Sequence, residues 1–250
     1  MPLNKKGEKL MKNENEQNNV ARIIGRVAVE PKKSHEIEGE GFYELVLEVK
    51  RLSETYDYIP VTISERTLDF RRIEKGDNIA VVGEFRSYNK QENEKTKLIL
   101  HLFVKELYLE DELSMLDDPS NTNSILITGY LCKDPIYRVT PFKREICDAL
   151  IAVNRRNFKS DYLPCIFWGR NARFMENQQV GTKISIEGRI QSRQYIKKFE
   201  NGTEEKRTAY EISVSKLKEM LLEDSESYAK NEVYKEYISS YQPKEDVMGK

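Results

Sequence analysis

Apolar and polar side chains alternate along two stretches in the second half of the chain. In residues 183–195, isoleucines and a glycine occupy every second position as far as Ile190, and polar or charged residues lie between them. In residues 161–168, Cys165 and Phe167 fall on one side and Trp168 falls on the other. Because side chains two residues apart point to the same face of a strand, this alternation predicts two β-strands, each with one face toward a core.

Residues 123–221 are expected to hold five strands and one short helix. The expected elements, in chain order, are strands at 124–132, 148–156 and 161–168, a helix at 169–177, and strands at 183–195 and 209–217. Three strands, a helix and two further strands in about a hundred residues is the layout of the oligonucleotide/oligosaccharide-binding (OB) barrel.

The chain repeats itself at an offset of about a hundred residues. Residues 19–27 (NVARIIGRV) align with 123–131 (NSILITGYL), and residues 57–60 (DYIP) align with 161–164 (DYLP). Later in the chain the offset grows by a few residues, as loop insertions between two copies of a domain would make it do. The first copy is therefore expected to have the same elements, with its helix at 65–73. The predicted fold class is all-β, with two tandem five-stranded OB barrels.

The repeat divides the chain into an N-terminal tail (1–18), a first barrel (19–110), an acidic linker (111–122), a second barrel (123–221) and a polar C-terminal tail (222–250). The net charge of the whole chain is -1. The second barrel, however, holds 18 basic and 11 acidic side chains, whereas the first holds 15 basic and 17 acidic ones. Such a charge difference between halves indicates a polyanionic partner for the second barrel.

Several classes of protein are excluded by what the sequence lacks. No stretch approaches the roughly 20 apolar residues of a membrane-spanning helix, and the first residues have no apolar core of a secretory signal. Three cysteines without a CxxC motif and two histidines predict reduced thiols, with neither a zinc site nor disulfide bonds. The glycine loop of ATPases, the Gly-x-Ser-x-Gly motif and a spaced acid–base set are all missing. We therefore expect a protein that is not an enzyme and has no cofactor.

The second half carries a series of motifs that resembles the bacterial single-stranded DNA-binding proteins. The motifs are, in order, the residues at 131–140 (LCKDPIYRVT), 151–155 (IAVNR), 161–169 (DYLPCIFWG), Gly181 and 186–193 (IEGRIQSR). The first half follows the same pattern more loosely. The resemblance implies a tandem-barrel member of that family, binding single-stranded DNA in replication, recombination or repair, in the cytoplasm at the nucleoid.

Binding a single strand without reading its sequence needs flat side chains for the bases and cations along the phosphates. The stacking candidates are, on the second barrel, Trp168, Tyr162, Tyr195 and Phe158 and, on the first, Tyr58, Tyr56 and Tyr88. The four on the second barrel match positions at which the resembled family stacks bases. The phosphate-contact candidates are Arg155, Arg156, Lys159, Arg189, Arg193, Lys197, Lys198, Arg51, Arg86 and Lys90.

Alternative roles remain open for several of these residues. Trp168 could fill a core, but its position opposite Cys165 and Phe167 favours stacking. Tyr162 and Tyr195 could equally be ordinary strand tyrosines that pack against an interface. The position on the first barrel that matches Trp168 is Ser64, so this barrel is either an auxiliary binder or mainly a subunit interface.

The resembled proteins assemble four barrels around one strand, so the resemblance implies a homodimer of this two-barrel chain. A second hypothesis is that the barrels form a protein-interaction adaptor of a replisome or primosome, with weak or no DNA binding. The fold alone does not separate the two hypotheses, because barrels of this kind also bind other ligands.

Overall fold

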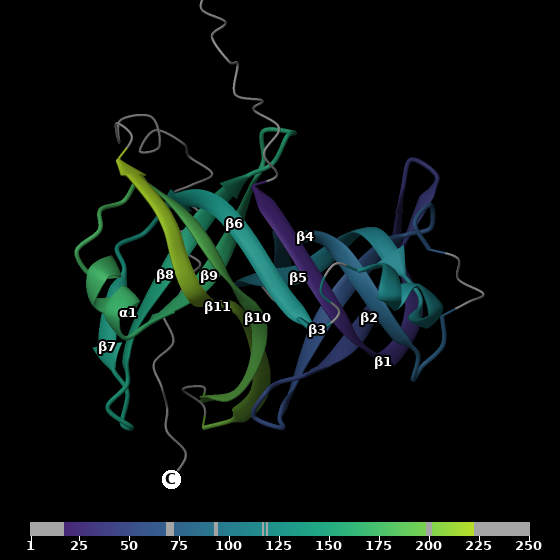
Figure 1. The fold of residues 1–250 in the computed structure, drawn as a ribbon, viewed down its shortest axis with the longest axis horizontal. Coiled ribbons are helices and arrows are strands. Elements are labelled where there is room, and N and C mark those ends of the chain that lie inside the picture. Colours follow the sequence, from purple (N-terminus) through teal and green to yellow (C-terminus); the bar gives the residue numbers. More distant parts are fainter. Residues whose placement is uncertain are drawn as a thin grey trace, which may run out of the picture.

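The computed structural model describes residues 18–68, 73–92, 95–116, 118, 120–198 and 202–222. Except for residues 18 and 222, the two expected tails lie outside the described residues. Figure 1 shows two β-barrels side by side, the first in purple and blue and the second in teal, green and yellow.

The first barrel is a closed ring of five strands. The strands are β1 (Asn19–Ile37), β2 (Glu40–Lys50), β3 (Tyr56–Ser64), β4 (Asn78–Glu92) and β5 (Lys95–Tyr108). Antiparallel pairs join β1 to β2, β2 to β3, β5 to β4 and β4 to β1, and a short parallel pair joins β3 to β5. The ring encloses a core of buried aliphatic side chains around Phe85.

The second barrel closes in the same order. Its strands are β6 (Asn123–Leu131), β7 (Ile136–Val139), β8 (Glu145–Asn154), β9 (Ser160–Trp168), β10 (Thr182–Lys198) and β11 (Glu204–Leu222), with helix α1 (Arg170–Met175) between β9 and β10. The ring runs β6–β8–β9–β11–β10 and back to β6, and β9 and β11 are again parallel. The all-β fold with two five-stranded barrels is therefore confirmed.

The structure also differs from the expected elements. Strand β7 was not expected, and it pairs with the first half of β8 at the end of the second barrel. Helix α1 lies inside the range where a helix was expected. In the first barrel, residues 65–67 form a turn, and residues 69–72 of the expected helix lie outside the described residues. The acidic linker begins with a 3-10 helix, η2 (Glu110–Met115).

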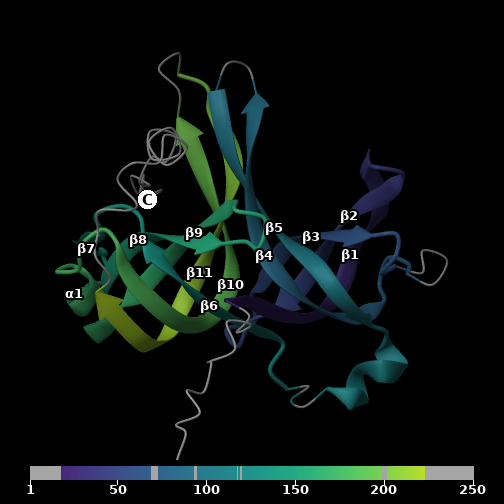
Figure 2. The same ribbon diagram turned by 90° about the horizontal axis from the view of Figure 1, so that it is seen from above.

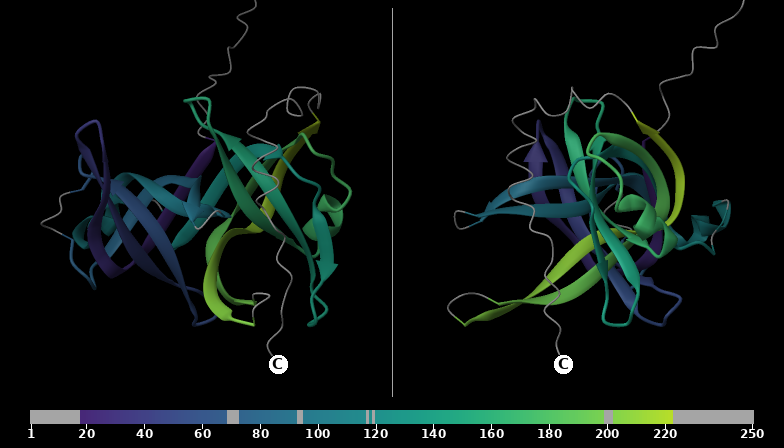
Figure 3. Two further views of the ribbon diagram at one scale, coloured as in Figure 1. Left: turned by 180° about the vertical axis from the view of Figure 1, so that it is seen from behind. Right: turned by 90° about the vertical axis from the view of Figure 1, so that its left-hand side faces the viewer.

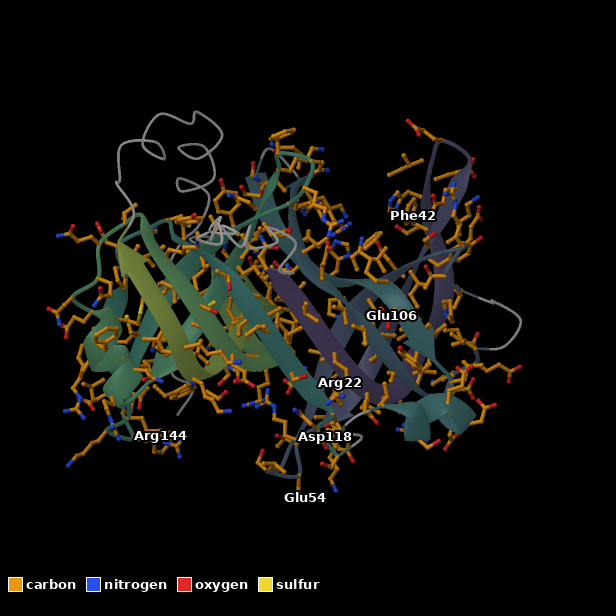
Figure 4. All side chains as sticks on the ribbon, turned by 45° about the horizontal axis from the view of Figure 1, so that its top comes forward. Arg22, Phe42, Glu54, Glu106, Asp118 and Arg144 are labelled. Carbon is orange, nitrogen blue, oxygen red and sulfur yellow. The ribbon has the colours of Figure 1, made fainter. Side chains whose placement is uncertain are left out.

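The two barrels are joined by an antiparallel pair between β1 and β6. The register is symmetric, because Ala21 pairs with Ile125, Asn19 with Ile127 and Ile23 with Asn123. The end of the linker lies beside β1, where the side chain of Arg22 donates a hydrogen bond to the carbonyl of Asp118 at 2.9 Å (Figure 4). The pairing makes one continuous sheet of both barrels.

Two long hairpins, β4–β5 and β10–β11, project from the same side of the molecule (Figures 2 and 3). Each hairpin contains a glycine opposite a bulge of the partner strand, Gly83 in β4 and Gly188 in β10. A Cβ at Gly83 would collide with the carbonyl of Phe103, and one at Gly188 would collide with the carbonyl of Ser213. Only glycine therefore lets the paired strands approach and bend at this point.

Candidate nucleic-acid interface

Trp168 lies at the end of β9 on the outside of the second barrel. Its side chain is 36 % exposed, and its indole Nε1 donates to Ser213 Oγ on β11 at 3.0 Å. The next residue, Gly169, has a φ of 53°, which turns the chain sharply into α1. The indole is thus fixed in orientation but keeps part of its surface open to solvent, and it does not contribute to the core.

Phe158 lies at the tip of the loop between β8 and β9 and is fully exposed. Its φ is 61°, a left-handed conformation that is rare for a bulky side chain. The loop is closed by a hydrogen bond from the Arg155 N–H to the Lys159 carbonyl at 2.7 Å. An exposed ring on a strained, closed loop, beside the exposed cations of Arg156 and Lys159, suits contact with a ligand better than packing.

The β10–β11 hairpin carries Tyr195 and the cations that were expected beyond it. Tyr195 is partly exposed and pairs across the hairpin with Arg207, which the sequence analysis did not single out. Lys198 is exposed, and its Nζ lies 3.0 Å from Glu204. A cation opposite an aromatic residue in a predicted hairpin was the signal that could have identified Arg207.

Two of the expected phosphate contacts, Arg155 and Arg189, lie instead at the junction of the barrels. Arg155 Nε donates to the buried carboxylate of Asp161 at 2.8 Å, and its NH2 donates to the carbonyl of Ser87 on the other barrel at 2.9 Å. Arg189 lies 3.4 Å from Asp57 of the first barrel. Burial and the nearby guanidinium of Arg51 lower the pKa of Arg189.

Arg51 repeats the arrangement of Arg155 on the first barrel. It donates through Nε to Asp57 at 2.8 Å and through NH2 to the carbonyl of Ser192 at 2.8 Å. Hydrogen bonding to Asp57 raises the pKa of Arg51. These guanidinium groups are therefore engaged by carboxylates and carbonyls of the protein itself.

Tyr162 lies on the outward row of β9, as the alternation predicts, but its side chain is only 5 % exposed. It packs with Cys132, Leu150 and Ala152, and Leu98 of the β4–β5 hairpin packs against this cluster. Burial raises the pKa of its phenol. In this structure the ring has an interface role, which was one of the two roles that the sequence left open.

The first barrel presents its expected tyrosines on the surface. Tyr56, Tyr58 and Tyr88 are all exposed, and the Tyr58 hydroxyl donates to Glu48 at 2.9 Å. Hydrogen bonding to Glu48 raises the pKa of Tyr58. The expected cations Lys90 and Arg86 have different surroundings. Lys90 is exposed, whereas the guanidinium of Arg86 lies over the ring of Phe103.

Groups that could support other chemistry are few in the described part of the chain. The cysteines Cys132, Cys147 and Cys165 are buried and free. Burial raises the pKa of the Cys132 and Cys147 thiols to about 12, so both are protonated at neutral pH. No group of three or more His, Cys, Asp or Glu side chains in the described ranges could hold a metal ion. No described helix is long and apolar enough to cross a membrane.

The sequence of the second barrel matches a known family. Residues 122–220 match the model of the single-strand binding protein family. A single-stranded DNA-binding protein of Oceanobacillus iheyensis is 32 % identical over 80 residues, which are 29 % of this chain and 50 % of that protein. Single-stranded DNA-binding protein 3 of Streptococcus agalactiae is 35 % identical over 81 residues, which are 29 % of this chain and 58 % of that protein. The chain thus spans about half the length of the curated relatives it matches.

Solved structures resemble the whole two-barrel arrangement. The single-stranded DNA-binding protein of Thermus aquaticus superposes with a TM-score of 0.60 at 19 % identity, over 80 % of this chain and 91 % of that chain. A deletion mutant of the same protein gives 0.61 at 20 % identity, over 82 % and 95 %. At this identity the likeness shows a shared fold. Together with the family match, it confirms the resemblance drawn from the motifs.

Proposed function

Because residues 122–220 belong to the single-strand binding protein family, we propose that this chain binds single-stranded DNA without reading its sequence, mainly through its second barrel. The barrels at 19–110 and 123–221 are the two binding domains, and the linker at 111–122 joins them. The protein would act in the cytoplasm, in replication, recombination or repair, without a cofactor and without catalysis.

The observation that carries the proposal is the pair of exposed rings, Trp168 and Phe158, on the barrel with the basic excess. Stacking of a base on an aromatic side chain contributes about 1–3 kcal/mol and tolerates any base, because every base has a flat face. Tyr195 extends the row of rings along the β10–β11 hairpin. The other expected cations of this barrel are Arg156, Lys159, Arg193, Lys197 and Lys198. Of these, Arg193 lies 3.9 Å from Glu211 and Lys198 lies 3.0 Å from Glu204.

The remaining candidates divide between two roles. Tyr56, Tyr58, Tyr88, Arg86 and Lys90 form an auxiliary surface on the first barrel. Arg51, Arg155, Arg189 and Tyr162 hold the barrels together, so their contribution to binding is indirect. The engagement of the three arginines across the junction and the burial of Tyr162 also favour the second hypothesis, a protein-interaction adaptor, because they make three cations and one ring less available to DNA.

Fluorescence anisotropy of labelled oligo(dT), measured with the full chain, separates the two hypotheses. We expect tight binding that Trp168→Leu weakens, and no comparable binding to duplex DNA. The matched control is Phe174→Leu, which removes an exposed ring on α1 of the same barrel and should leave the affinity unchanged. Absence of oligo(dT) binding at tens of micromolar protein would favour the adaptor.

A further inference from the structure

The indole of Trp168 is hydrogen-bonded to a small side chain of the neighbouring parallel strand. Its partner is Ser213 on β11, whose hydroxyl accepts the indole N–H at 3.0 Å. On the second barrel, therefore, β9 carries the aromatic side chain and the neighbouring strand β11 carries a serine. The equivalent positions of the first barrel can be identified from strand register.

Ser64 on β3 occupies the place of Trp168. Ser64 pairs with Phe42 on the second strand of its barrel, as Trp168 pairs with Ile146. The serine is buried, and its hydroxyl donates to the carboxylate of Glu40. Taken alone, this position presents no aromatic surface.

Phe103 on β5 occupies the place of Ser213. Each of the two residues lies two positions before a bulge residue of its own strand and one register step from a glycine of the neighbouring strand, Gly83 or Gly188, and its carbonyl lies against that glycine. The first barrel thus carries an aromatic residue and a serine at these two positions, as the second barrel does. In the first barrel, however, the serine is on β3 and the aromatic residue is on β5. The aromatic surface on this part of the first barrel comes from β5, the counterpart of β11, instead of from β3, the counterpart of β9.

Phe103 is part of a row of flat groups. The guanidinium carbon of Arg86 lies 3.8 Å from the centroid of its ring. The ring of Phe42 lies 6.1 Å away at an angle of 39°, and His35 stacks on Phe42 at 4.9 Å and 10°. Phe42 lies on the first barrel at the base of the arm formed by the ends of β1 and β2 (Figure 4). Phe42 is buried, whereas Phe103 and Arg86 are partly exposed, and a partly exposed ring beside a planar cation offers the groups that unstacked bases bind.

The charges beside Phe103 leave an excess of one cation. Lys105 Nζ lies 5.1 Å from the centroid of the Phe103 ring. Glu84, the carboxylate that faces Phe103 across the strands, is paired with Arg86 at 2.6 Å and with Lys105 at 3.7 Å. Two cations against one carboxylate suit a base whose phosphate lies nearby.

We propose that Phe103 and Arg86, supported by the buried Phe42, form a base-stacking site on the first barrel that serves as the counterpart of Trp168 on the second. The occupant is a nucleobase of the same single strand of DNA, so the inference rests on the proposed function. The first barrel then takes part in binding even though its position equivalent to Trp168 holds a serine.

A single-tryptophan reporter tests the site in the full chain. Trp168 is the only tryptophan, so the double variant Trp168→Phe, Phe103→Trp carries one indole, at the proposed site. Saturating oligo(dT) should quench this indole. The control is Trp168→Phe, Tyr108→Trp, which moves the reporter five residues along β5, beside the acidic helix η2, where oligo(dT) should leave the emission unchanged.

The outcomes distinguish the inference from the function on which it rests. If the unaltered chain does not bind oligo(dT), both are overturned. If it binds and the indole at position 103 is not quenched in a variant that still binds, the stacking site is overturned and the proposed function stands. As a second measurement, Phe103→Leu keeps the apolar bulk and should weaken binding about 5- to 150-fold, whereas Phe174→Leu should not. Equal affinities of these two variants would also overturn the site.

Discussion

Asp57 accepts a hydrogen bond from the backbone N–H of Ser192 at 2.6 Å, although the two residues belong to different barrels. The relationship is reciprocal, because Asp161 accepts the backbone N–H of Ser87 at 2.6 Å. Each serine hydroxyl in turn accepts the N–H of the residue that follows the aspartate, Tyr58 at 3.0 Å and Tyr162 at 2.8 Å. With the arginines that clamp both aspartates, these contacts form a duplicated latch across the barrel junction.

We predict that Asp57→Ala and Asp161→Ala each destabilise the chain by about 3–5 kcal/mol, because removing the buried carboxylate leaves a partly buried arginine without its partner. Urea unfolding measures the effect. Glu36→Ala is the matched control, since it removes the carboxylate of an ion pair on the surface, with Lys33. A midpoint shift as small as that of the control would show that the latch does not hold the barrels together.

A second prediction concerns pH. Burial, with the nearby charges of Arg86 and Arg155, lowers the pKa of His101 from 6.5 to about 4. Because the unfolded chain then binds the proton more readily than the folded one, stability should fall as the pH drops from about 6.5 to about 4, by roughly 3 kcal/mol for this group. Above pH 6.5 its contribution should be constant.

The His101 contribution is measured as a difference between two stability profiles, because carboxylates titrate in the same range. His101→Gln keeps a polar partner for Thr62, which lies 2.6 Å from His101 Nδ1, and it should show a shallower loss of stability between pH 6.5 and 4. If the free energy of unfolding of the unaltered chain and that of His101→Gln fall in parallel with pH, the lowered pKa of His101 is contradicted.

The salt dependence of binding should separate the exposed cations from those of the latch. Each cation that neutralises a phosphate adds about -0.7 to the slope of log affinity against log salt for a single strand. Arg156→Gln should therefore make the slope less steep by about 0.7. Arg155→Gln, which alters the latch, should reduce stability while the slope stays the same. If Arg155→Gln makes the salt slope less steep and Arg156→Gln does not, the phosphate contact belongs to Arg155 and the prediction is contradicted.

We also predict a homodimer with four barrels, closed by two-fold symmetry through the less basic first barrel. Light scattering at micromolar concentration should give twice the mass of the chain. A species with the mass of one chain, still able to bind oligo(dT), would show that two barrels suffice.

The fold could be predicted from the sequence because the repeat and the strand alternation are local signals. The aligned residues 57–60 and 161–164 lie on equivalent strands, β3 and β9. The site could be predicted only in part. The alternation of side chains along β9 places Tyr162 on the outward face of the strand. Only the tertiary structure shows that Leu98 of the other barrel packs against this face.

Comparison of the two repeats contains one further signal and misses one feature. An arginine six residues before an aspartate occurs in both repeats, and this spacing was the signal that Arg51 and Arg155 pair within the chain. Ser64 suggested a barrel without an aromatic surface. Phe103 lies near that position from another strand, which an alignment of equivalent residues does not reveal.

The emission of Trp168 during a titration with oligo(dT) tests the central claim most directly, since every change in indole fluorescence comes from this one side chain. A partly exposed indole held against Ser213 should be strongly quenched when a base stacks on it. The quenching should saturate and should weaken as salt is added. Unchanged emission at protein and oligo(dT) concentrations of tens of micromolar would contradict the account, because no base would then be in contact with Trp168.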